Sequence, residues 1–131
     1  MKYLSRDEVL VYHARIIDET GGSHGVRDLN LLYSLIERPK MKFGGKDLYT
    51  SVFDKAAAYF ESCAFHHIFT DGNKRTAIAV SVSFLVLNGY EFNATNKEVV
   101  DFVLSAVKNK YTIKKVSAWI KNNSKKHSDE E

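Results

Sequence analysis

Apolar residues recur every three or four positions along most of the chain, which is the spacing of helices that bury one face. Ser5 and Glu8 have the spacing of a capping box, so we predict a first helix that runs to about Thr20, where two glycines end it. Asp28 is placed to cap a second helix, and Pro39 stops that helix.

Two more deeply buried helices are predicted for the middle of the chain. Small and aromatic residues repeat at helical spacing from Val52 to a point near His66 or His67. The stretch 76–87 is then apolar on nearly all sides. Its VSVSFLV segment alternates like a strand, but the length of the stretch and the preceding helix favour a central helix, ended by the Asn-Gly pair at 88–89.

The remaining segments complete the predicted architecture. Residues 40–49 hold two adjacent glycines between aromatic residues and predict an exposed loop or a short hairpin. Thr95 opens a helix with a second capping box, Thr112 starts the last helix, and the chain beyond that helix has no apolar residue. We therefore predict an all-α fold: a single domain of about six helices over residues 1–123, with a frayed tail over 124–131.

Composition narrows the class of protein. With 131 residues, of which 44% are hydrophobic, the chain fits one domain with its own core. The net charge of +3 is spread along the chain, so nucleic acid is permitted as a partner but not indicated, and we expect no direct contact with it. The lone Cys63 predicts a buried, reduced thiol. Neither a signal peptide nor a membrane span of roughly 20 apolar residues is apparent, so we expect a cytoplasmic protein.

The stretch HIFTDGNKRT, residues 67–76, joins the two most apolar predicted helices and suits an anion site. The first N–H groups of a helix have no intrahelical partner, and the peptide dipoles leave positive charge there. Gly72 permits a sharp turn, Asn73 suits the N-cap, and the helix begins around Lys74. The dipole disfavours Lys74 and Arg75 by about 0.3–1 kcal/mol each, and a bound phosphate would compensate for both. No Gly-x-x-x-x-Gly precedes the lysine, so this is not a Walker A loop.

Asp71 and His67 add chemistry to this anion site. One carboxylate together with phosphate oxygens is a usual way to hold Mg²⁺, and an imidazole can take a proton from a hydroxyl near neutral pH. The pair therefore predicts phosphoryl or nucleotidyl transfer. Taken singly, each residue also has a structural interpretation: a core histidine for His67 and a turn or capping residue for Asp71.

Other interpretations of the histidines have less support. A zinc site at His66, His67 and Asp71 is disfavoured, because adjacent helical side chains diverge by about 100 degrees and no second pair of ligands follows. The glycines of residues 21–25 predict only a loop that ends a helix. No companion residues suggest a role for the remaining histidines, His13, His24 and His127.

Residues 67–75 resemble the signature of the Fic/Doc superfamily, HxFx(D/E)GN followed by a variable residue and Arg. Lys74 at the variable position matches the Doc (death on curing) branch, whereas Ile68 departs from the Pro that is usual there. Further segments between residues 25 and 93 resemble Doc-like sequences: Gly25–Asp28, Leu31–Leu32, Arg38–Pro39, Phe43–Gly45, Lys55–Ala57, Thr76–Ala77 and Asn88–Gly89.

The resemblance implies a Fic fold in which the motif loop joins two central helices. It implies that His67 is the general base for a Ser, Thr or Tyr hydroxyl of a target protein, that Asp71 binds the Mg²⁺ of ATP, and that Phe69 packs beneath the loop. It also assigns the ATP phosphates to Gly72, Asn73, Lys74 and Arg75, and a target-aligning flap to Phe43, Gly44, Gly45, Lys46 and Asp47.

The lysine at position 74 bears on which group is transferred. Most Fic enzymes have Gly there, which leaves room for the ATP orientation that transfers AMP. In the Doc branch a lysine goes with an inverted nucleotide, so the resemblance implies a kinase-like toxin that transfers the terminal phosphate of ATP to elongation factor Tu and inhibits translation. AMP transfer and an inactive Fic-fold binding module are the alternatives.

The resemblance also bears on how the activity is restrained. We find no match in this chain to the inhibitory (S/T)xxxE(G/N) motif of self-restrained Fic proteins. Toxins of the Doc branch resemble this chain in lacking that motif. The resemblance therefore implies that the protein is neutralised by a Phd-like antitoxin, whose disordered segment folds into a groove on the toxin.

Overall fold

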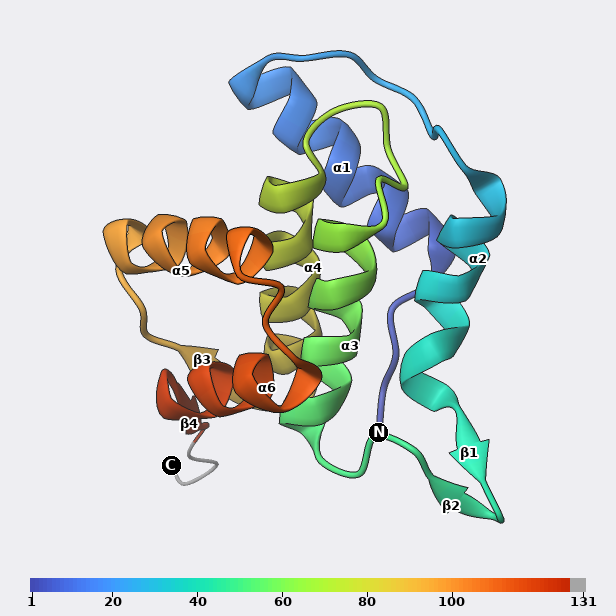
Figure 1. Cartoon of the computed structure of the whole chain (residues 1–131), viewed down its shortest axis with the longest axis vertical. Coiled ribbons are helices and arrows are strands. Elements are labelled where there is room, and N and C mark those ends of the chain that lie inside the picture. Colours follow the sequence, from blue (N-terminus) through green and yellow to red (C-terminus); the bar gives the residue numbers. More distant parts are fainter. Residues whose placement is uncertain (128–131) are drawn as a thin grey trace.

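Two antiparallel helices, α3 (Val52–Phe65) and α4 (Asn73–Leu87), form the centre of the molecule (Figure 1). The computed structural model describes residues 1–127 of the chain. Within that range the predicted six helices are present in the predicted order. None of these helices has both the length and the apolar character needed to cross a membrane. The other four helices surround the central pair: α1 (Arg6–Thr20), α2 (Leu29–Glu37), α5 (Asn96–Lys108) and α6 (Ile113–Asn122).

Side-chain hydrogen bonds fix the helix starts that the sequence predicted. The capping box of α1 forms, because Ser5 Oγ accepts from the Glu8 N–H at 3.1 Å and the Glu8 carboxylate accepts from the Ser5 N–H at 2.8 Å. The same reciprocal pair opens α5. Three further side chains accept the exposed N–H groups at the starts of α2, α3 and α6, namely Asp28, Ser51 and Thr112. These local contacts explain why the helix starts could be predicted.

Small side chains allow α3 and α4 to pack closely. Ala56 of α3 and Ala77 of α4 are fully buried, and Ser81 Oγ donates a hydrogen bond of 3.2 Å to the Ala56 carbonyl across the pair. Cys63 is a buried free thiol, and burial raises its pKa, so the thiol stays protonated. The close pair holds the loop between the two helices, residues 66–72, at one end of the molecule (Figure 1).

Two short antiparallel hairpins complete the fold. The first, β1 (Lys42–Phe43) with β2 (Lys46–Asp47), confirms the exposed loop or hairpin predicted for residues 40–49. The second pairs β3 (Tyr90–Phe92) with β4 (Ser124–Lys126), where a frayed tail was predicted from residue 124. That prediction is wrong for residues 124–126, because backbone groups form the pairing and polar side chains do not oppose it. The last four residues of the predicted tail, 128–131, lie outside the described range.

Candidate active site

The loop between α3 and α4 enters α4 through a left-handed glycine. Gly72 has φ of 78° and occupies the N-cap position, and α4 begins at Asn73. The sequence had placed Asn73 at the N-cap, but Asn73 is the first helical residue. Glycine takes the cap position because it adopts positive φ without steric cost. His67 also has positive φ, 50°, which is uncommon for a residue with a side chain, and such residues cluster at functional sites.

The Asn73 side chain closes the loop on itself. Its Oδ1 accepts a hydrogen bond of 2.9 Å from the Phe69 N–H, and its Nδ2 donates one of 2.9 Å to the Phe69 carbonyl. Both ends of the amide are therefore bonded to the backbone of a single residue. The side chain was expected to bind phosphate. Its Oδ1 and one hydrogen of its Nδ2 are used by Phe69, so the second Nδ2 hydrogen and the backbone N–H of Asn73 remain as donors.

A second segment, Gly25–Asp28, runs antiparallel beside the loop. A bridge pairs Val26 with Phe69, and the Thr70 N–H donates to the Gly25 carbonyl at 3.1 Å. The Arg27 N–H donates to the Ile68 carbonyl at 2.8 Å, and Arg27 Nε donates to the His67 carbonyl at 2.7 Å. The carbonyls of His67 and Ile68 are thus held from outside the loop, which fixes the backbone on the C-terminal side of His67.

The end of α1 and the turn after it support Asp71. The Ser23 N–H donates a hydrogen bond of 2.7 Å to Asp71 Oδ2. Gly22 has φ of 110°, and a Cβ there would lie 3.2 Å from the Asp71 Cβ, so glycine favours this close approach. The glycine-rich segment 21–25, predicted only to end a helix, therefore also positions the carboxylate. The sequence contains no signal for this contact, because the donor is a backbone N–H.

The aromatic ring of Phe69 lies beneath the loop. It is fully buried and stacks on the ring of His13, with the ring centroids 3.8 Å apart and the planes 9° apart. His13 is also a hydrogen-bond partner of the Asp71 carbonyl. Sequence reasoning assigned no role to His13. The available signal was its position between Val9 and Ile17 on the buried face of α1.

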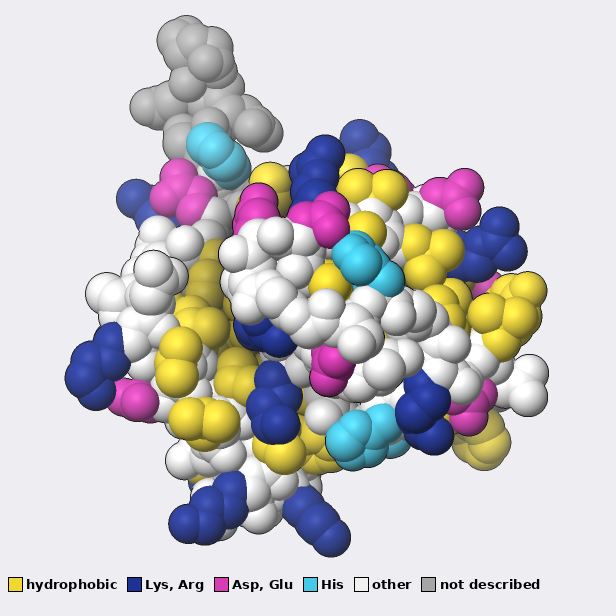
Figure 2. Space-filling model, turned by 90° about the horizontal axis from the view of Figure 1, so that it is seen from above, with side chains coloured by type: hydrophobic (Ala, Val, Ile, Leu, Met, Phe, Trp, Pro, Cys, Tyr) yellow, Lys and Arg dark blue, Asp and Glu magenta, His cyan; other side chains and the backbone are white. Residues whose placement is uncertain are grey.

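The predicted functional side chains meet at one cavity. Figure 2 looks onto this end of the molecule, where basic, acidic and histidine side chains lie beside exposed hydrophobic ones. The imidazole of His67 is exposed and has no hydrogen-bond partner among residues 1–127. The cavity has a volume of about 330 Å³ and is lined by Ala64, His67, Thr70, Asp71, Gly72, Asn73, Lys74 and Arg75.

The first turn of α4 has the donors that a phosphate group needs. The Thr76 N–H makes the first hydrogen bond of the helix, to the Gly72 carbonyl, so the N–H groups of the three preceding residues have no intrahelical partner. Lys74 has no ion-pair partner in the described part of the chain. Arg75 contacts Thr20 Oγ1 at the end of α1. Free N–H groups and two cations around one cavity fit the phosphates of a nucleotide.

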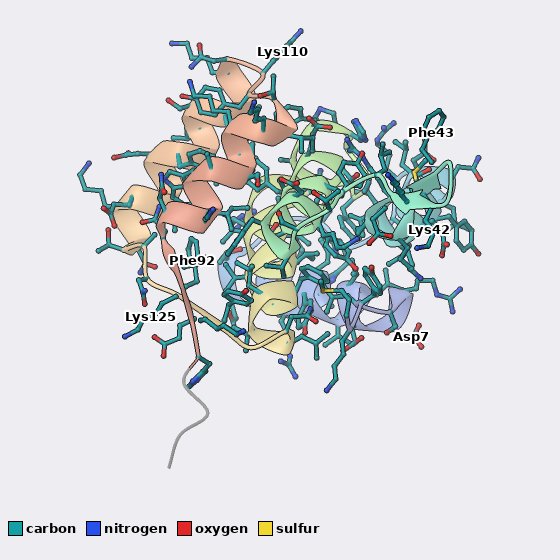
Figure 3. The ribbon with its side chains drawn as sticks, turned by 90° about the horizontal axis from the view of Figure 1, so that it is seen from below. Asp7, Lys42, Phe43, Phe92, Lys110 and Lys125 are labelled. Atoms are coloured by element: carbon teal, nitrogen blue, oxygen red, sulfur yellow. The ribbon has the colours of Figure 1, made fainter. Side chains whose placement is uncertain are left out.

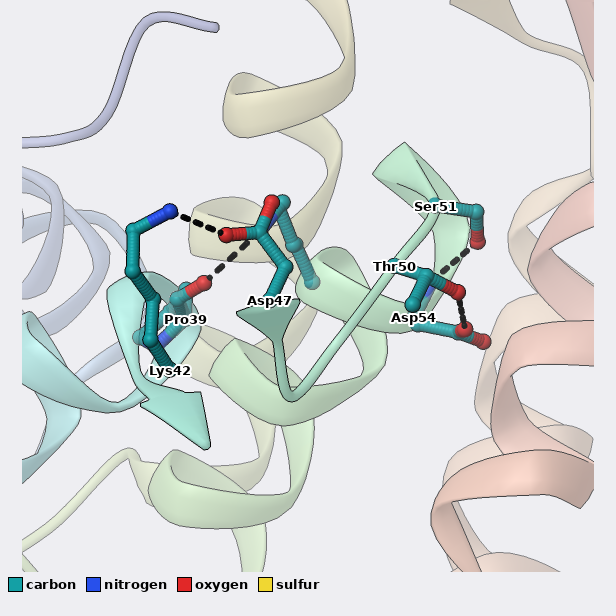
Figure 4. Close-up of polar contacts among 7 residues, drawn as sticks. Pro39, Lys42, Asp47, Thr50, Ser51 and Asp54 are labelled. Carbon is teal, nitrogen blue, oxygen red and sulfur yellow. Dashed lines mark hydrogen bonds and ion pairs between the residues drawn. The ribbon is translucent and has the colours of Figure 1, made fainter. Parts of the chain in front are cut away.

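The hairpin β1–β2, predicted as a target-aligning flap, is attached to the start of α3. The Lys55 side chain is 1% exposed, and its Nζ lies 3.1 Å from the Pro39 carbonyl oxygen and 3.4 Å from Asp47 Oδ2. Asp47 Oδ1 lies 3.0 Å from Lys42 Nζ (Figure 4). These two ammonium groups, Lys42 first, lower the pKa of Asp47. The hairpin is therefore held next to the first turn of α3.

This attachment places the hairpin far from the motif loop. The 14 residues of α3 span about 21 Å, and the hairpin and the loop lie at opposite ends of that helix (Figure 1). Phe43, which is 82% exposed, lies at the edge of the molecule (Figure 3). The structure does not bring the predicted flap beside His67, because the direction of α3 carries the two segments apart. The segments that contact the loop are Gly25–Asp28 and α1 with the turn after it.

The described residues do not support the alternative of a zinc site. No cluster of three or more His, Cys, Asp or Glu side chains in residues 1–127 could hold a metal ion. His66 is exposed at the C-cap of α3 and does not line the cavity. One carboxylate, Asp71, is the protein ligand that this site offers, which is consistent with the small number of protein ligands that Mg²⁺ uses beside a phosphate.

The fold and the site together define the class of protein. A mostly helical domain whose central helices are joined by this histidine-containing loop is the architecture implied by the motif. The model of the Fic/DOC family matches residues 3–85, and the chain belongs to this family. It is similar to Toxin Doc of Mycolicibacterium smegmatis, with 41% identity over 93 residues, which cover 71% of this chain and 69% of that protein. It is also similar to Protein kinase doc of Escherichia phage P1, with 28% identity over 117 residues, 89% of this chain and 91% of that protein.

Proposed function

We propose that this protein is the toxin of a toxin–antitoxin system and transfers the terminal phosphate of ATP to a hydroxyl group of a target protein. The observation that carries this proposal is that His67, Asp71 and the first turn of α4 line the same cavity. The similarity to a protein named a toxin and to one named a protein kinase supports the same assignment.

His67 is the proposed general base. Its imidazole is exposed at the cavity and is not bonded to another described residue, so it is free to accept a proton. In the proposed step the hydroxyl proton passes to the imidazole, the hydroxyl oxygen forms a bond to the terminal phosphorus, and the bond from that phosphorus to the bridging oxygen breaks, releasing ADP. Lys74, Arg75 and the free N–H groups of the helix start would hold the phosphates.

Asp71 is the proposed ligand of Mg²⁺. One of its oxygens, Oδ2, accepts from Ser23, while Oδ1 has no hydrogen-bond partner among the described residues. The Ser23 contact limits rotation of the carboxylate and leaves one oxygen for a cation. When bound, Mg²⁺ would supply positive charge that offsets the charge of the phosphates.

Transfer of a radioactive label tests the reaction directly. The protein is incubated with Mg²⁺, a target protein and ATP labelled on either the terminal or the first phosphate. Label from the terminal phosphate alone supports the proposal, whereas label from the first phosphate shows AMP transfer and contradicts it. Mass spectrometry of the target gives the same distinction, with a gain of about 80 mass units for phosphate or about 329 for AMP.

Elongation factor Tu is the proposed target, on the strength of the family resemblance. The test compares purified elongation factor Tu with a cell extract as substrate. We expect the main labelled protein in the extract to have the mass of elongation factor Tu, and a different labelled protein would contradict this choice while leaving the reaction intact.

The catalytic role of His67 has a matched control in the neighbouring histidine. His67→Ala should lower the transfer rate by about 10²–10⁴-fold and remove growth inhibition on expression. His66→Ala removes an imidazole that is also exposed but does not line the cavity, and it should retain activity. Unchanged growth inhibition in His67→Ala would favour an inactive binding module over an enzyme.

An apolar groove next to the cavity is the proposed site of an antitoxin. It has a volume of about 340 Å³, lies between α4 and α5, and has Lys74 and Arg75 at its edge, where it meets the cavity. An amphipathic segment with an acidic residue would fit the apolar lining and the two cations, and it would cover the proposed phosphate site. The apolar residues that line the groove are Ile78, Val99, Val100, Val103 and Leu104.

Neutralisation by a co-expressed antitoxin tests this groove. Leu104 is 56% exposed, so Leu104→Asp should leave folding and toxicity intact while preventing neutralisation. Leu48, which is 49% exposed and lies outside the groove, gives the matched control Leu48→Asp. If the antitoxin neutralises both variants equally well, the antitoxin does not depend on this groove.

A further inference from the structure

His13 is a buried histidine outside the motif that contacts two residues of the motif loop. It lies in the middle of α1 and is 4% exposed. Its ring is nearly parallel to the ring of Phe69, and its Nε2 lies 2.8 Å from the carbonyl oxygen of Asp71. The proposed transfer reaction uses neither contact, so His13 requires a separate explanation.

The hydrogen bond defines the proton on His13. A carbonyl oxygen can only accept, so Nε2 must carry the hydrogen and donate to Asp71. Burial favours the neutral ring and lowers the pKa of His13, which leaves Nδ1 without a proton in this tautomer. Among the described residues His13 is the only donor to the Asp71 carbonyl. The orientation of that carbonyl therefore depends on His13.

The direction of one carbonyl decides the direction of the next N–H. In a planar trans peptide the C=O and the N–H point in opposite directions. Because the Asp71 carbonyl points at α1, the N–H of Gly72 points away from α1. Gly72 lines the cavity, and no acceptor among residues 1–127 is bonded to its N–H.

We infer that His13 is a positioning residue that orients the Asp71–Gly72 peptide, so that the Gly72 N–H faces the cavity as a donor for a phosphate oxygen. This inference rests on the proposed function for the identity of the ligand. Its structural part, the orientation of one peptide unit by His13, stands on the hydrogen bond and the ring contact alone.

The Asp71–Gly72 peptide needs a hydrogen bond to hold its orientation, because Gly72 gives it conformational freedom. Glycine adopts positive and negative φ with similar ease, so the peptide before Gly72 can rotate more easily than other peptides of the loop. A rotated peptide would present the Asp71 carbonyl oxygen to the cavity in place of the N–H. A phosphate would then meet an acceptor that repels it where it now meets a donor.

The close approach of the loop to α1 also depends on Gly72. A Cβ at this position would lie 3.0 Å from Ile17 Cδ1 and 3.8 Å from His13 Nε2. A side chain at position 72 would therefore require the end of the Ile17 side chain to move, so glycine favours the close approach of the loop to α1. His13 and Gly72 are thus two parts of one arrangement, the first holding the peptide and the second permitting the approach.

Two variants separate the hydrogen bond from the packing. His13→Phe keeps an aromatic ring against Phe69 but removes the donor. His13→Gln keeps an N–H donor but removes the aromatic contact. If His13 only fills the core, ATP affinity should follow stability, and His13→Phe should bind ATP more tightly than His13→Gln. If His13 positions the peptide, His13→Gln should bind ATP more tightly than His13→Phe, although it is the less stable variant.

The experiment combines nuclear magnetic resonance of the Gly72 amide with ATP binding. In ligand-free His13→Phe we expect the Gly72 amide resonance to shift and broaden, because the peptide exchanges between orientations, and in His13→Gln we expect it to return toward its wild-type position. The dissociation constant for ATP with Mg²⁺ should rise about 10- to 100-fold in His13→Phe, the range for losing a hydrogen bond to a charged group.

The outcomes distinguish this inference from the proposed function. If the Gly72 resonance and the ATP affinity of His13→Phe match the wild type, His13 does not orient the peptide and the inference is wrong, whatever reaction the protein catalyses. If the wild type neither binds ATP nor transfers phosphate while the Gly72 resonance responds as expected, the proposed function fails and the orienting role of His13 stands.

Discussion

Replacing Asn73 by alanine should measure how much the motif loop contributes to the stability of the domain. The variant loses two hydrogen bonds of 2.9 Å and leaves the N–H and carbonyl of Phe69 without these partners in a partly buried position. A neutral hydrogen bond contributes about 0.5–1.5 kcal/mol, so the two together contribute about 1–3 kcal/mol. The higher helix propensity of alanine offsets at most about 0.7 kcal/mol. Taking the middle of the first range, about 2 kcal/mol, less this offset, we expect the unfolding free energy to fall by about 1–2 kcal/mol.

Urea denaturation followed by circular dichroism checks this value. With an m-value of about 2 kcal/mol/M, the midpoint should decrease by about 0.5–1 M. Asn122→Ala is the control, because Asn122 is exposed at the end of α6 and its side chain makes no hydrogen bond within the described residues; its effect should stay within about 0.5 kcal/mol. If both variants change stability equally, the amide of Asn73 does not hold the loop closed.

Three further changes test the support beneath the loop. Phe69→Ala removes a fully buried ring and should lower the unfolding free energy in urea by about 3–5 kcal/mol; a loss below about 1 kcal/mol would contradict the packing. Gly72→Ala places a Cβ 3.0 Å from Ile17 at positive φ, so a calorimetric measurement should show a loss of at least about 1–2 kcal/mol, and no loss would contradict the left-handed cap. Burial lowers the pKa of His13 from its ordinary 6.5, so the unfolded chain binds more protons and stability falls as pH decreases through about 6.5. His13→Phe should lose less stability between about pH 7.5 and 5.5, and an identical loss in both proteins would refute this effect.

The helices could be predicted because their signals are local. Each capping side chain lies three residues from the N–H that it accepts, as Ser5 does from Glu8, and each buried face repeats within a few residues. The candidate site could also be predicted from the sequence, because its proposed general base, carboxylate and cations all fall within residues 67–75. A helix start and a short run of side chains are enough to indicate an anion site.

The errors lie where distant parts of the chain meet. β4 was missed because its pairing with β3 uses backbone groups, which every residue has and which leave no pattern in the sequence. The expected position of the hairpin β1–β2 was not matched because the direction of α3 and the contact between Lys55 and Asp47 decide where that hairpin lies. The contact of the Asn73 amide with the Phe69 backbone could not be predicted, because that partner is specified by the loop conformation.

By itself the sequence determined which segments become helices and which residues stand at the start of α4, because capping, periodicity and a contiguous motif act over a few positions. Only the tertiary structure brought His13 to Asp71, 58 positions away, and the Ser23 N–H to the Asp71 carboxylate, 48 positions away. The physical reason is that these contacts join backbone groups to side chains across packed helices. Their partners are therefore chosen by how α1 lies against the loop, which no short stretch of sequence specifies.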